Sequence, residues 1–75
     1  MPYFLSYRNA KDAVDHVIKL LAAEKYRTDY LNVEVLKSRK GFFIDVSCET
    51  DPQITVRFRH LLREYVRTMR KYISV

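Results

Sequence analysis

The sequence predicts one α+β domain over residues 1–75, in the order strand–helix–strand–strand–helix. Its sheet is expected to have three antiparallel strands, with two helices covering one face. Three observations predict this fold: two apolar stripes with helical spacing, two alternating apolar and polar stretches between them, and the only glycine placed between those stretches. A core this small is marginal alone, so we expect a protein partner: a second copy, a paralogue or a larger enzyme subunit.

The first strand is expected over residues 3–8, where aromatic side chains alternate on both faces. A helix should follow from Asn9, a favourable N-cap residue with Asp12 three positions later, and end near residues 25–27. Its buried stripe is Ala10, Ala13, Val14, Val17, Ile18 and Leu21. Leu20 and Ala23 widen this stripe, which predicts either more core or a second contact surface.

The next two strands form a predicted antiparallel hairpin. The connection between them holds Gly41, and a tight hairpin often needs a residue with positive φ. One face should be covered by the helices, and its residues are Leu31, Val33, Val35, Phe42, Ile44, Val46 and Cys48. The other face is left open, and its candidate interaction residues are Phe4, Tyr30, Leu36 and Phe43.

The last element is a helix that begins with Asp51 as N-cap and Pro52 at its first position. Its apolar stripe is expected to run from Ile54 to Ile73 and consists of Ile54, Phe58, Leu61, Leu62, Tyr65, Val66, Met69, Tyr72 and Ile73. The opposite side carries Arg57, Arg59, Arg63, Arg67, Arg70 and Lys71.

The charge of the chain is concentrated on this last helix. The chain has 14 Lys and Arg against 9 Asp and Glu, a net charge of +5. A row of arginines on a helix can follow a nucleic-acid backbone, because each neutralised phosphate releases counterions. The sequence does not distinguish RNA from DNA, and a solvated helix face is the alternative. Lys37, Arg39 and Lys40 in the hairpin connection are candidates for a second phosphate contact.

No residue pattern indicates catalysis, a metal or a cofactor. His16 and His60 lack metal-ligand spacing, and Cys48 is the only cysteine, which excludes an internal disulfide. One glycine cannot form a glycine-rich phosphate loop. The apolar runs are too short to span a membrane and no signal peptide is visible, so we expect a cytoplasmic protein that is not an enzyme.

The element order and several segments resemble the small dimerising subunit of the KEOPS complex. The matching segments are residues 4–7 leading into 9–14, residues 18–24, the hairpin residues 33–35 and 43–46, and residues 56–63. The family commonly has small residues early in the last helix, where this chain has Arg57, Phe58 and Arg59. A divergent paralogue that pairs with the standard subunit fits this departure.

The resemblance implies a non-catalytic subunit, since the complex transfers a threonylcarbamoyl group to tRNA through its ATPase-fold subunit. The small subunit would dimerise through its sheet, dock the catalytic subunit through its helices and help to hold tRNA. Leu20 and Ala23 would then be docking residues, and the tRNA-facing candidates would be Arg59, Arg63, Arg67 and Arg70. Two alternatives are open: a stand-alone nucleic-acid-binding or inhibitor protein, for example a viral one, and a small α+β enzyme.

Overall fold

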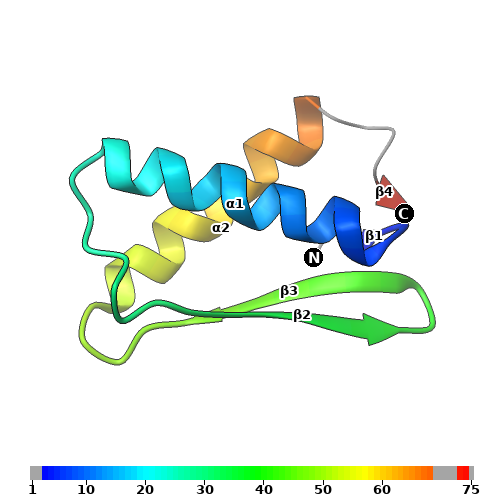
Figure 1. The fold of residues 1–75 in the computed structure, drawn as a ribbon, viewed down its shortest axis with the longest axis horizontal. Helices are drawn as coiled ribbons and strands as arrows, with labels where there is room; N and C mark the ends of the chain where they lie inside the picture. Colours follow the sequence, from blue (N-terminus) through cyan, green and yellow to red (C-terminus); the bar gives the residue numbers. More distant parts are fainter. Residues whose placement is uncertain (1–2, 69–72, 75) are drawn as a thin grey trace.

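A computed structural model describes residues 3–68 and 73–74 of the chain. The elements are β1 (Tyr3–Phe4), α1 (Tyr7–Ala23), β2 (Asn32–Ser38), β3 (Gly41–Ser47), α2 (Pro52–Thr68) and β4 (Ile73–Ser74). Both helices lie on one side of the antiparallel sheet, which confirms the predicted α+β class (Figure 1). The sheet order is β2-β3-β1-β4, so the short β4 adds an edge strand to the three that were expected.

The hairpin register separates the two faces of the sheet. Val35 lies opposite Ile44, and Val33 opposite Val46, on the face that the helices cover. Leu36 lies opposite Phe43 on the open face, as predicted. Gly41 has a φ of 131°, so the glycine does occupy a position that a side chain would disfavour.

The core forms between the helices and the covered face of the sheet. Its largest fully buried side chains are Phe4, Val17, Leu21, Ile54 and Phe58. The prediction that Phe4 belongs to the open face is wrong: it is 0% exposed. Phe4 lies opposite Phe42 in the register, and paired residues share a face, so its ring is directed toward the helices.

The predicted bounds of the first strand and of α1 differ from the structure: α1 ends at Ala23, before the expected residues 25–27. α1 begins at Tyr7 because Ser6, not Asn9, is its N-cap: the Ser6 hydroxyl oxygen accepts a hydrogen bond from the Asn9 backbone N–H at 3.1 Å. The first strand therefore shortens from residues 3–8 to Tyr3–Phe4.

The start of α2 is confirmed. Asp51 Oδ1 accepts a hydrogen bond from the Gln53 backbone N–H at 3.1 Å, and Pro52 is the first helical residue. The prediction that Ile73 continues this helix is wrong, because Ile73 pairs with Phe4 in β4. Met69 and Tyr72, also expected in the helix, lie outside the described residues. In the described part of the chain, neither helix is long and apolar enough to cross a membrane.

Candidate nucleic-acid interface

The outer side of α2 carries three exposed arginines at steps of four residues: Arg59, Arg63 and Arg67. This side lies opposite the buried stripe that holds Ile54, Phe58 and Leu62, because residues four apart follow one another along a helix face. We call the three residues the arginine face. Arg70 and Lys71, which were predicted to extend it, lie outside the described residues.

The guanidinium groups of Arg59 and Arg63 have no hydrogen-bond or ion-pair partner among the described residues. Arg67 lies 3.4 Å from Glu64, and both side chains are largely exposed. An exposed pair of this kind holds its partners weakly, so Arg67 remains accessible to a ligand.

Arg57 has a different role from the rest of the predicted set. Its Nε and Nη2 donate hydrogen bonds to the two carboxylate oxygens of Glu24 at 2.8 and 2.6 Å. The bond from Arg57 lowers the pKa of Glu24 below its ordinary value of 4.5, and the same contact raises the pKa of Arg57. Arg57 therefore joins α2 to the C-terminal end of α1, and its charge already has an acidic partner.

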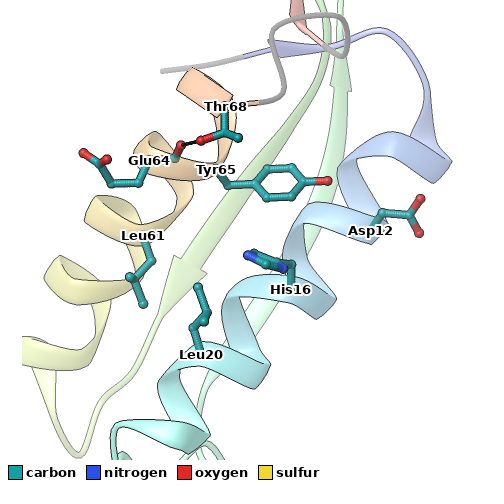
Figure 2. A pocket seen from close by; sticks show the side chains of 7 residues that line it. All are labelled: Asp12, His16, Leu20, Leu61, Glu64, Tyr65 and Thr68. Atoms are coloured by element: carbon teal, nitrogen blue, oxygen red, sulfur yellow. Dashed lines mark hydrogen bonds between the residues drawn. The ribbon is translucent and has the colours of Figure 1, made fainter.

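A groove of about 520 Å³ lies between the two helices on the side away from the sheet (Figure 2). Its lining residues are Asp12, His16, Leu20, Leu61, Glu64, Tyr65 and Thr68. The rings of His16 and Tyr65 lie 5.0 Å apart at its centre, with Leu20 and Leu61 beyond them. Leu20 is 37% exposed, so part of its side chain is available to a partner.

The acidic side chains of the groove do not converge on one point. The carboxylates of Asp12 and Glu64 point toward opposite outer sides of the groove, as Figure 2 shows. Among the described residues, no three His, Cys, Asp or Glu side chains are grouped closely enough to hold a metal ion. Cys48 follows directly after β3 and is buried in the core, and its Sγ lies 3.4 Å from the Thr50 hydroxyl oxygen.

The remaining predicted interface residues are scattered over the surface. Leu36 is 37% exposed on the open face, and Phe43 is half-buried beside Tyr3. Tyr30 is exposed but lies in the loop before β2, at the other end of that strand from Leu36. Ala23 is exposed at the last position of α1 and does not line the groove.

Sequence reasoning missed two features of this surface. Tyr7 was assigned to a strand, but it opens α1 and packs its ring against Phe42 with 6.2 Å between the ring centres. Recognising Ser6 as a helix cap would have placed Tyr7 correctly. The partner of Arg57 was also missed, because a contact between residues 33 positions apart leaves no local signal.

Comparisons with protein-family models, curated protein sequences and solved structures found no match to this chain.

Proposed function

We propose that this chain is a non-catalytic nucleic-acid-binding protein that holds an RNA backbone along the arginine face of α2. The observation that carries the proposal is the pair Arg59 and Arg63, two exposed guanidinium groups one helical turn apart with no acidic partner in the described residues. A structural role would favour paired or packed arginines, as Arg57 is. Unpaired arginines in a row are typical of a surface that binds phosphates.

The spacing of these residues supports contact with a phosphodiester backbone. Four helical residues advance about 6 Å, so successive arginines can reach successive phosphates along one strand. Each neutralised phosphate releases counterions and adds roughly 0.7 to 0.9 to the slope of log affinity against log salt concentration. The affinity should therefore fall steeply with salt.

The resemblance to the small KEOPS subunit makes tRNA the favoured ligand of this proposal and an enzyme subunit the favoured partner. The apolar groove between α1 and α2, with Leu20 at its rim, is available for docking such a partner. Leu36 on the open face of the sheet is available for contact with a paralogue. Both surfaces support an accessory subunit, and we propose that it lies with its enzyme in the cytoplasm.

The arginine face is tested by the double variant Arg59→Glu and Arg63→Glu. We expect its affinity for a folded tRNA transcript, measured by fluorescence anisotropy, to fall at least tenfold. The slope of log affinity against log salt concentration should become shallower by the contribution of about two phosphate contacts. Circular dichroism should be unchanged, because both side chains are exposed. Lys19→Glu with Lys25→Glu is the matched control, since it changes the net charge equally at two exposed sites away from this face.

Two outcomes would contradict the proposal. If the double variant and the control weaken binding equally, only net charge matters and the arginine face is a solvated surface. If duplex DNA of equal charge binds as tightly as folded tRNA, the tRNA part fails. In that case the stand-alone nucleic-acid-binding or inhibitor protein becomes the better description.

A further inference from the structure

One end of the molecule combines aromatic rings with cationic side chains. It consists of residues 3–8, which form β1 and the first turn of α1, and residues 37–43, which form the β2–β3 turn and its flanks. We call it the hairpin end. Figure 1 shows the β2–β3 turn, β1 and the start of α1 together at this end, with the C-terminal end of α2 directed toward the same side.

The rings and cations of the hairpin end form two rows. In one row, Tyr7 packs edge-on against Phe42, and Lys37 Nζ lies 5.8 Å from the centre of the Phe42 ring. In the other row, Phe43 packs edge-on against Tyr3, and Lys40 Nζ lies 5.7 Å from the centre of the Tyr3 ring. Because Phe42 and Phe43 are adjacent in β3, the two rows meet on opposite faces of one strand.

This end is partly open to solvent, although the rings of Tyr3, Phe42 and Phe43 are half-buried. Tyr7 is 55% exposed and the neighbouring Leu5 is 61% exposed. Arg8, Lys37 and Arg39 are exposed and make no ion pair within the described ranges. Arg8, Lys37 and Arg39 therefore lie at this end without an acidic partner among the described residues, which is an arrangement that folding alone does not require.

The chemistry of this end selects among possible ligands. A second copy would bring the same positive charges face to face, which is unfavourable. A membrane-inserting turn would carry apolar side chains at its tip, whereas the tip here is Ser38-Arg39-Lys40-Gly41. Exposed aromatic rings among cations fit a single-stranded nucleic acid, whose bases stack on rings while its phosphates pair with Lys and Arg.

We propose that the hairpin end binds an unpaired stretch of RNA, with Tyr7 stacking on a base and Arg8, Lys37 and Arg39 neutralising the adjacent phosphates. This inference deepens the proposed function, on which it rests for the nature of the ligand, by naming the single-stranded part of the RNA and the residues that bind it. On the open face, Glu34 and Asp45 lie directly opposite each other beyond Phe43, and their negative charges would repel phosphates there.

The absence of tryptophan from the sequence provides a direct test. Tyr7→Trp creates a single indole at the proposed stacking position. Its fluorescence should be quenched by a twelve-nucleotide oligouridylate but not by a blunt RNA duplex with the same number of phosphates. In the tyrosine background, Tyr7→Ala should weaken oligouridylate binding roughly tenfold and leave duplex binding unchanged, because stacking needs an unpaired base. Tyr30→Ala is the matched control, since Tyr30 is similarly exposed at the opposite end of the molecule.

The outcomes separate this inference from the proposed function. If the indole of Tyr7→Trp is not quenched and Tyr7→Ala binds oligouridylate like the parent protein, while the Arg59 and Arg63 double variant loses affinity for tRNA, the stacking site is wrong and the proposed function stands. If the indole is quenched but the double variant binds tRNA normally, the arginine face is wrong and the stacking site stands. A blue shift of the indole emission on phosphatidylserine vesicles, with no quenching by RNA, would overturn the inference in favour of a membrane surface.

Discussion

The two ends of this molecule are held together by different chemistry. At the end formed by the α1–β2 and β3–α2 loops, which we call the loop end, Glu24 binds Arg57 through two hydrogen bonds and Arg27 lies 3.7 Å from Asp29. At the hairpin end, residues 3–8 and 37–43 pack through aromatic rings, and Arg8, Lys37 and Arg39 have no acidic partner within the described residues. Arg57 and Arg27 at the loop end therefore have carboxylate partners, whereas Arg8, Lys37 and Arg39 at the hairpin end are left for a ligand.

This difference indicates which cations are functional candidates. A guanidinium held by a carboxylate, as in Arg57, would have to break that bond before it could bind a phosphate. Unpaired cations beside rings have no such bond to break. The net positive charge of the chain is thus a poor guide by itself, and the pairing of each residue decides whether its charge is available.

The largest expected effect is the loss of stability when Phe4, the buried ring of the hairpin end, is replaced. Phe4 is fully buried there, so Phe4→Ala should lower the free energy of unfolding by about 3 to 5 kcal/mol, through lost apolar burial and the cavity left behind. A loss of this size approaches the total stability of a domain this small. Urea titration followed by circular dichroism measures it. Phe4→Leu, which leaves a smaller cavity, should give a folded protein with an intermediate midpoint.

The matched control for Phe4 is Phe43→Ala, on the open face of the same end. Phe43 is only half-buried, so its loss should cost clearly less than the loss of Phe4. Equal effects of the two variants would contradict the assignment of Phe4 to the core. Phe4 would then belong to the open surface that the sequence predicted.

Phe4 also shows where sequence reasoning succeeds and where it fails. The helices and the hairpin were predicted because apolar spacing repeats many times in each, so single exceptions do not matter. β1 has two residues, too few for any period, and the orientation of Phe4 is set by its pairing with Phe42 and Ile73.

The candidate site follows the same division: the helical face could be predicted from the sequence, and the tertiary contacts could not. Arg59, Arg63 and Arg67 lie on one side of a long helix, so their common face follows from helical geometry. The Glu24–Arg57 pair and the Tyr7–Phe42 contact depend on how distant segments pack, and no local pattern encodes them. Tertiary contacts therefore decided which of the predicted cations are free.

A smaller effect is expected at the loop end, where α1 stops at a strained residue. Lys25 has a φ of 73°, and the bonds from the Lys25 N–H to the Ala22 carbonyl and from the Tyr26 N–H to the Leu21 carbonyl form a Schellman cap. Glycine is preferred at this position, so Lys25→Gly should raise the free energy of unfolding by about 1 kcal/mol, after allowing for the added freedom of the unfolded chain. Lys25→Ala is the control and should give no comparable gain, because alanine retains the Cβ atom. A gain with alanine equal to that with glycine would show that the lysine charge, and not the backbone, limits stability here.

The smallest expected effect is a pH dependence that belongs to the loop end alone. The hydrogen bonds from Arg57 lower the folded-state pKa of Glu24 below 4.5, its ordinary value and the one it should have in the unfolded chain. The folded state then binds this proton less readily than the unfolded state does. The stabilisation is therefore fully present above about pH 4.5 and is lost as the pH falls through the lowered value.

Glu24→Gln removes this stabilisation, so the urea midpoints of the parent protein and the variant should differ at neutral pH and converge in acid. Glu49→Gln is the control, since it removes an exposed carboxylate that has no ion pair to any described residue. The difference in urea midpoint between the parent protein and Glu49→Gln should not change with pH. Curves for the parent protein and Glu24→Gln that stay parallel from neutral to acid pH would show that Arg57 does not hold Glu24 in solution, and Arg57 would then return to the set of cations available to a ligand.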